Sequence, residues 1–148
     1  MNGYSPLHTS RRKARFVLAP ISMSLLLAYG SAQALPTDGS IVPGQANITQ
    51  NGQHLAIQQT SPRAIINWGN FSIGANESVA FTQPGRDSVA LNRVIGNSPS
   101  NIHGQLSANG RVYLVNPSGI LFGPGASISV GSLVASTLNI DNSDFMAG

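Results

Sequence analysis

The sequence predicts an all-β fold, a parallel β-solenoid in which each coil of backbone is stacked on the one before it. The first observation is a triplet of two apolar or small residues followed by asparagine, which ends at Asn67, Asn92, Asn116 and Asn139. Successive asparagines are separated by 25, 24 and 23 positions, an interval typical of solenoid repeats. The second observation is an apolar/polar alternation between the triplets, and the third is a charged fraction of only 9%.

Each predicted strand is short and is bounded by turn residues. Segments 78–82, 111–114 and 126–130 alternate apolar and polar side chains with a period of two, and Gly, Pro and Asn interrupt them. A coil of about 24 residues, at about 3.3 Å per residue minus its turns, encircles a small solenoid once. An apolar residue also precedes each asparagine by ten or eleven positions, at Ile57, Phe81, Leu106 and Ile128.

The four asparagines are predicted to occupy corners between strands. Asparagine tolerates the left-handed backbone conformation that a sharp corner requires. Equivalent side chains of adjacent coils lie about 4.8 Å apart, so asparagine amides can form hydrogen-bonded ladders, whereas repeated charges repel. The alternative fold is an ordinary β-sandwich whose turns contain asparagine by chance.

Residues 1–34 are predicted to be a cleavable signal peptide that takes no part in the fold. Four basic residues precede an apolar run at 16–29, and Ala32 and Ala34 form a small-x-small site that predicts cleavage before Leu35. The apolar run is too short to span a bilayer comfortably. The general secretory machinery is therefore the expected export route, and residues 35–148 are the expected folded domain.

The charge balance of residues 35–148 argues against a nucleic-acid partner. This part of the chain has four arginines, five acidic residues and no lysine, which gives a net charge of −1. No basic patch is available to follow a phosphate backbone. The sequence has no cysteine, so the exported chain is stabilised without disulfides.

The sequence offers little for catalysis or for metal binding. His54 and His103 stand alone, without the spacing of a metal site, and Asp141 and Asp144 lie in a polar tail. We therefore expect no catalytic residue, no metal and no cofactor. The alternative function is a β-helical carbohydrate-active enzyme or carbohydrate-binding fragment, which would need acids and bases clustered across adjacent coils.

The longest turn-rich block covers residues 108–123 and contains an Asn-Pro-Ser-Gly sequence between two strand-like segments. Pro117 fixes φ at the second turn position, Gly119 can adopt positive φ, and the Asn116 side chain can bond back to the turn backbone. A tight β-turn between two buried strands is predicted.

This block and several others resemble the N-terminal secretion domain of filamentous haemagglutinin-like exoproteins of the two-partner secretion pathway. The resemblance runs in family order across about residues 37–147, and its other segments are 64–68, 71–74, 79–81, 83–84, 92–94, 100–104 and 131–137. It implies a right-handed parallel β-helix with an N-terminal cap, for which we expect residues 35–52. The polar C-terminal segment 141–148 is expected to form no cap.

The resemblance also implies site residues. The Asn-Pro-Asn-Gly-Ile secretion motif of the family falls on Asn116, Pro117, Ser118, Gly119 and Ile120, and Ser118 departs from the usual asparagine. Asn92 and Arg93 match an Asn-Arg pair of the family, which we assign to corner geometry and partner contact. Whether the motif touches a partner or only shapes the β-helix stays open.

The implied partner is an outer-membrane transporter whose periplasmic domains recognise the secretion domain and export the chain to the cell surface or the medium. Full members of the family continue into long regions that carry adhesive or toxic functions. We therefore expect this chain to be the front part of a longer exoprotein, which reaches a host cell surface through regions beyond it.

Overall fold

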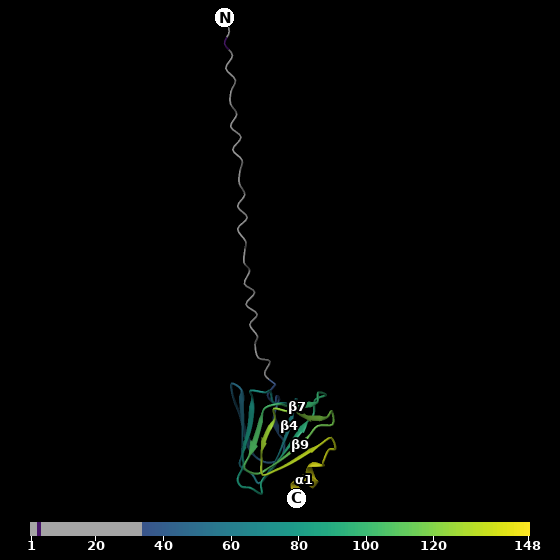
Figure 1. Ribbon diagram of the computed structural model, residues 1–148. Coiled ribbons are helices and arrows are strands. Elements are labelled where there is room, and N and C mark those ends of the chain that lie inside the picture. Colours follow the sequence, from purple (N-terminus) through teal and green to yellow (C-terminus); the bar gives the residue numbers. More distant parts are fainter. Residues whose placement is uncertain (1–2, 4–33) are drawn as a thin grey trace. The chain divides into compact units, whose positions relative to one another are not determined.

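The computed structural model describes Gly3 and residues 34–148 (Figure 1). The chain divides into two units, Met1–Gly30 and Ser31–Gly148, and all described strands lie in the second. Most of the predicted signal peptide, Ala32 included, lies outside the described residues. The described elements are β1 (Ser40–Ile41), β2 (Ala46–Asn51), β3 (His54–Gln59), β4 (Arg63–Trp68), β5 (Ser78–Thr82), β6 (Val89–Val94), β7 (Ser100–Ile102), β8 (Gln105–Ala108), β9 (Arg111–Val115), β10 (Ile120–Phe122), β11 (Ser127–Ser129), β12 (Ser132–Ser136) and α1 (Asn142–Ala147).

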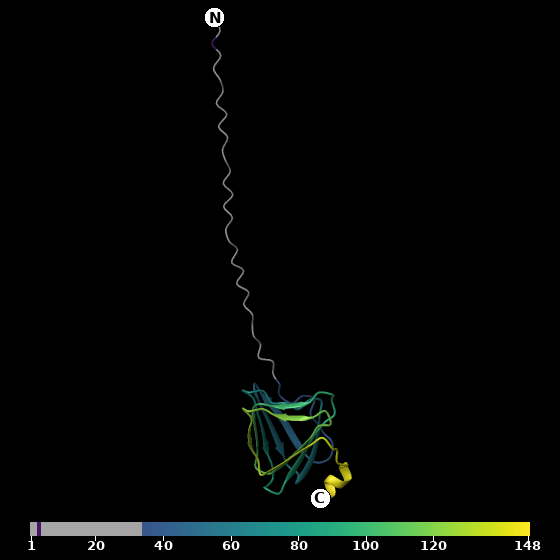
Figure 2. The same cartoon turned by 45° about the vertical axis from the view of Figure 1, so that its right-hand side comes forward.

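Three sets of parallel strands form the sides of a coil. The first side contains β3, β5, β8 and β11, and the second contains β4, β6, β9 and β12. The third side is short, with β7 paired to β10 and a single bridge from Ile73 to Ile102. The chain visits the sides in the same order in each turn, so successive coils are stacked (Figures 1 and 2). The predicted parallel β-solenoid is confirmed.

Apolar side chains stack in columns along the inside of the coils. One column is in register through four strands and consists of Leu55, Val79, Leu106 and Ile128. The first three of these side chains are at most 3% exposed. Each fully buried aliphatic side chain contributes about 1.5–3 kcal/mol, so the continuous column stabilises the fold without disulfides.

The N-terminal segment covers the open edge of the first coil, as expected of a cap. β1 pairs antiparallel with β4, and β2 pairs antiparallel with β3. Leu35, before these strands, is 3% exposed and belongs to the main core. The cap therefore satisfies backbone groups that an uncovered edge strand would leave unpaired.

The expected stacking of asparagines is wrong. Asn67 and Asn92 lie within β4 and β6 rather than at corners, and they pair with Arg93 and Leu114 respectively. Since a shift of one residue turns a side chain to the opposite face of a sheet, the Asn67 and Asn92 amides cannot form a ladder. Asn116 and Asn139 do lie outside the strands, after β9 and β12.

Unequal coil lengths explain this error. The register advances by 26 residues from β4 to β6 (Arg63 to Val89), by 22 from β6 to β9 (Val89 to Arg111) and by 21 from β9 to β12 (Arg111 to Ser132). The asparagine interval varies much less, so the triplets drift relative to the strands. The interval predicted the approximate length of a coil but not the register.

An amide ladder does exist, but glutamines form it. Nε2 of Gln83 donates to Oε1 of Gln59 at 3.1 Å, and Gly110 N donates to Oε1 of Gln83 at 3.0 Å. Gln59 is 3% exposed and Gln83 is 5% exposed. The two side chains connect the corners of three successive coils. Gly110 leaves room for this contact, because an added Cβ would lie 2.6 Å from Oε1 of Gln83.

The C-terminal segment forms α1 rather than the expected tail without a cap. Asp141 is the N-cap and accepts hydrogen bonds from the backbone N–H and the hydroxyl of Ser143. The pKa of Asp141 is lowered below its usual value, first by the hydrogen bond from the Ser143 hydroxyl and then by the one from the Ser143 N–H. The charge of Arg93 lowers it more weakly. Phe145 is 2% exposed against an outer cluster with Ile65, Leu91 and Val115. Figure 2 shows α1 outside the stacked strands.

Candidate functional site

The predicted turn at residues 116–119 is present, directly after β9. Gly119 N donates to the Asn116 carbonyl oxygen at 3.0 Å, which closes a β-turn with Pro117 at its second position. Gly119 has a φ of +109°, whereas Ser118 is not among the positive-φ residues. Asparagine first, proline second and glycine fourth is the pattern of a type I turn, which needs no positive φ at the third position.

The Asn116 side chain holds the turn from inside the protein. It is 0% exposed, and its Oδ1 accepts from Ser118 N at 2.9 Å. Its Nδ2 donates to the Ser98 carbonyl oxygen at 3.0 Å and to the Ser100 hydroxyl at 2.9 Å. The amide therefore connects the turn to the loop of the preceding coil. Neither serine was predicted as a site residue, and only the match at residues 100–104 signalled that the segment is distinctive.

The surface of the turn is made by other residues. Pro117 and Ser118 are exposed, and so is the neighbouring loop at 97–99, which contains the Ser98 carbonyl bound by Asn116. Ile120 is half-buried and begins β10, whose Leu121 is 55% exposed. The motif thus separates into an inward residue that fixes the shape and outward residues that a partner can touch.

Asn92 is a buried polar residue of the core. It is 0% exposed, and its Oδ1 accepts from the Trp68 indole Nε1 at 2.9 Å. Its Nδ2 donates to the Tyr113 carbonyl oxygen at 3.3 Å. Asn92 therefore connects three stacked strands, so the expected corner role and partner contact do not fit this position.

Arg93, on the opposite face of β6, holds the C-terminal segment. Its Nε donates to Asn139 Oδ1 at 2.7 Å, its Nη1 to Asn142 Oδ1 at 2.7 Å and its Nη2 to the Ile140 carbonyl oxygen at 2.6 Å. All three guanidinium nitrogens are engaged within the chain. The expected corner role of Arg93 is wrong, because it lies within a strand, and its polar atoms are occupied by this segment.

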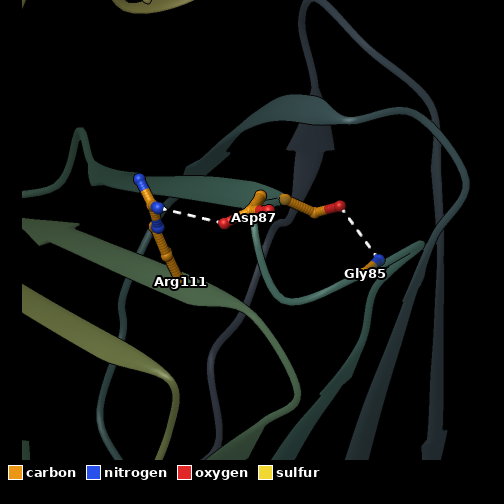
Figure 3. Close-up of polar contacts among 4 residues, drawn as sticks. Gly85, Asp87 and Arg111 are labelled. Atoms are coloured by element: carbon orange, nitrogen blue, oxygen red, sulfur yellow. Dashed lines mark hydrogen bonds and ion pairs between the residues drawn. The ribbon is translucent and has the colours of Figure 1, made fainter.

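One ion pair joins neighbouring coils within the described residues. Arg111 Nη2 lies 3.2 Å from Asp87 Oδ1, with the side chains 46% and 80% exposed (Figure 3). In the same turn, Gly85 N donates to the Ser88 hydroxyl at 3.1 Å. An ion pair this exposed contributes about 0–1 kcal/mol.

Two of the three residues at the predicted cleavage site are described. Ala34 N donates to Oε1 of Glu77 at 2.9 Å, and Leu35 is buried in the core. A cavity of about 270 Å³ is lined by Ala34, Leu35, Thr37, Asn70 and Ser72. Glu77 was not predicted as a site residue.

Other groups suited to catalysis or metal binding are sparse in the described part. His54 Nδ1 lies 2.6 Å from the Ser78 hydroxyl on an exposed surface. Among Gly3 and residues 34–148, no three His, Cys, Asp or Glu side chains gather in a way that could hold a metal ion. Over the same residues, no helix is long and apolar enough to cross a membrane.

Comparison with known proteins gives consistent matches. The family profile described as the TPS secretion domain matches residues 32–148. Two heme/hemopexin-binding proteins of Haemophilus influenzae are 45% and 41% identical, over 76% and 77% of this chain. The crystal structure of the HMW1 secretion domain from Haemophilus influenzae superimposes with a TM-score of 0.73 at 38% identity, over 76% of this chain and 30% of that one.

The match extends over most of the described residues but over little of the relatives. The aligned part spans 12% of each heme/hemopexin-binding protein. The matched family is one of secretion domains rather than a known family of enzymes. Its exoproteins are exported to the cell surface or the medium. With the profile covering residues 32–148 and the solenoid shared with a solved secretion domain, the chain belongs to the TPS secretion domain family of two-partner secretion exoproteins.

Proposed function

We propose that periplasmic domains of a dedicated outer-membrane transporter bind the outward face of the turn at 116–119 together with the loop at 97–99. The observation that supports this most is the burial of Asn116 with its amide fully hydrogen-bonded, while Pro117 and Ser118 stay exposed. A turn fixed from within presents its outward groups in one arrangement. Such preorganisation lowers the entropic cost of binding.

In this proposal the residues of the motif have different tasks. Asn116 and Gly119 determine the backbone path, and Pro117 and Ser118 contribute contact surface. Ile120 extends that surface toward β10. Asn92 and Arg93 act indirectly, since they stabilise the core and the C-terminal segment.

We also propose the route by which the chain reaches the transporter. The general secretory machinery carries the chain into the periplasm, and the signal peptide of residues 1–34 is removed after Ala34. The domain 35–148 is the front part of a longer exoprotein with an adhesin-like role at a host surface. The names of the relatives add heme or hemopexin binding as a candidate activity of that longer protein, carried by regions outside this domain.

The transporter contact is tested by placing bulk and charge on the turn. Ser118→Arg is compared with Ser107→Arg, which makes the same change at an exposed serine of β8, on another side of the coil. Binding to purified periplasmic transporter domains is measured by calorimetry. We expect Ser118→Arg to weaken binding roughly tenfold or more, as at a central interface position, and Ser107→Arg to bind like the wild type. Wild-type affinity of Ser118→Arg would refute the contact.

A further inference from the structure

Glu77 is a buried acid whose position none of the roles above explains. It is 5% exposed, and its Oε2 accepts from Gly74 N at 2.7 Å. Its Oε1 accepts from Ala34 N at 2.9 Å. Among the described residues the sole ion pair is the one between Arg111 and Asp87, so Glu77 has no cationic side chain beside it. Burying a carboxylate without a positive partner is costly.

The partner of Oε1 is the last residue of the predicted signal peptide. Cleavage hydrolyses the peptide bond between Ala34 and Leu35, and the added water leaves a carboxylate on Ala34 and an ammonium group on Leu35. Ala34 then departs, so Glu77 loses one of its hydrogen bonds. At the same step a new positive charge appears on the adjacent residue.

The position of Leu35 keeps this charge close to Glu77. Its side chain is 3% exposed in the main core, which anchors the start of the mature chain. Standard bond lengths place successive backbone nitrogens no more than about 3.7 Å apart. Cleavage removes Ala34, so the place of its N–H beside Oε1 of Glu77 becomes free for the ammonium group.

We propose that Glu77 is the binding site for the mature N-terminus: after cleavage, the Leu35 α-ammonium replaces the Ala34 amide on Oε1 of Glu77. Processing thus exchanges a neutral donor for a charged one, and hydrogen bonds between charged groups are the stronger kind. The ion pair fastens the N-terminal cap to the segment before β5. The inference rests on cleavage after Ala34, which belongs to the proposed function.

The burial of Leu35 determines whether cleavage or folding of the cap comes first. A peptidase must reach the bond between Ala34 and Leu35, and in the folded chain one of these residues is in the core and the other is hydrogen-bonded to Glu77. Cleavage therefore precedes closure of the cap. The ion pair then forms only in the processed chain.

The sequence makes a direct test possible, because lysine occurs only at position 13. After processing, the α-amino group is the one amine of residues 35–148, so an amine-reactive succinimidyl ester reports on it alone. The full chain is exported to the periplasm, the processed form is purified, and its first residue and labelling rate are measured by mass spectrometry. Glu77→Gln is compared with Asp38→Asn, which removes an exposed charge near the N-terminus and retains a residue that tolerates the φ of 57° at this position.

We expect the wild-type amine to react roughly tenfold or more slowly than that of Glu77→Gln, because a paired ammonium group stays protonated and shielded. Asp38→Asn should react like the wild type. Equal rates for wild type and Glu77→Gln would overturn the ion pair while leaving cleavage after Ala34 intact. A first residue other than Leu35 would overturn both. Should Glu77→Gln not fold, the wild type is labelled with and without urea, and equal rates there would also overturn the inference.

Discussion

Replacing Asn116 by alanine is the perturbation that best separates a shaping role from a contact role. The change removes the hydrogen bond from Ser118 N and the two that Nδ2 donates to the Ser98 carbonyl and the Ser100 hydroxyl. Ser100 is 0% exposed, so its hydroxyl is left without this partner and without bulk solvent. Asn116→Ala is therefore expected to lower the stability of the fold and to leave the exposed side chains of the turn unchanged.

The magnitude follows from these three bonds. Each contributes about 1 kcal/mol net, and a buried group left unsatisfied costs about 1–3 kcal/mol, so we expect the free energy of unfolding to fall by about 3 kcal/mol. A domain of this size is stable by only about 5–15 kcal/mol. With a urea dependence of about 1–3 kcal/mol per molar, the unfolding midpoint should fall by roughly 1–3 M.

The assay uses the single tryptophan of the chain. Trp68 is 1% exposed in the core, so its fluorescence changes when the coils unfold. Ser118→Ala is the matched control, because its side chain is exposed and the N–H that Asn116 accepts is retained. We expect the control to lie within about 0.5 kcal/mol of wild type. If Asn116→Ala unfolds at the same urea concentration as the control, the shaping role is refuted.

Three further predictions concern stability. Asn92→Ala should destabilise by about 2–3 kcal/mol, since it leaves the buried Trp68 indole N–H without its acceptor, and urea unfolding measures this loss. Asp87→Asn should change stability by less than about 1 kcal/mol, because its pair with Arg111 is exposed, and unfolding at low and high salt checks it. The pKa of Asp141 is lowered in the fold by hydrogen bonds it accepts, so its stabilising effect is present above the unfolded pKa and lost as pH falls through the folded pKa. Asp141→Ala should therefore weaken the pH dependence of unfolding in that acidic range; an unchanged pH profile would contradict it.

The architecture was predictable because composition and spacing report on it directly. Period-two alternation, a recurring interval near 24 residues and few charges all follow from stacking short strands in parallel. Register could not be predicted from the same data, because it depends on loop lengths that differ from coil to coil. The asparagine triplets keep their interval while the register from β4 to β6 and from β6 to β9 advances by different amounts. Gln59 and Gln83, which form the amide ladder, are also separated by 24 positions, the same interval as the asparagines.

The turn was predicted in more detail than the rest of the site, for a local reason. The turn depends on Pro117, on Gly119 and on the hydrogen bond that the Asn116 side chain makes within the turn. These residues lie within four positions of each other, so the sequence alone specifies the backbone path. The contacts of Asn116 with Ser98 and Ser100, and those of Arg93 with residues 139–142, join residues 16 to 49 positions apart. Such contacts require the fold. For the same reason Glu77 could not be connected with Ala34 from the sequence.

The position at which this chain departs from the family motif offers a final check on the division between shape and contact. Ser118 is exposed at the third position of the turn, and it contributes its backbone N–H rather than its side chain to the bond with Asn116. Type I turns accept most residues at this position. Ser118→Asn, which introduces the residue expected from the resemblance, should therefore leave the free energy of unfolding, followed by Trp68 fluorescence in urea, unchanged within about 0.5 kcal/mol. Any effect should be confined to affinity for the transporter domains. A destabilisation above about 1 kcal/mol would show that position 118 helps to hold the turn, and the motif could not then be separated into an inner residue for shape and outer residues for recognition.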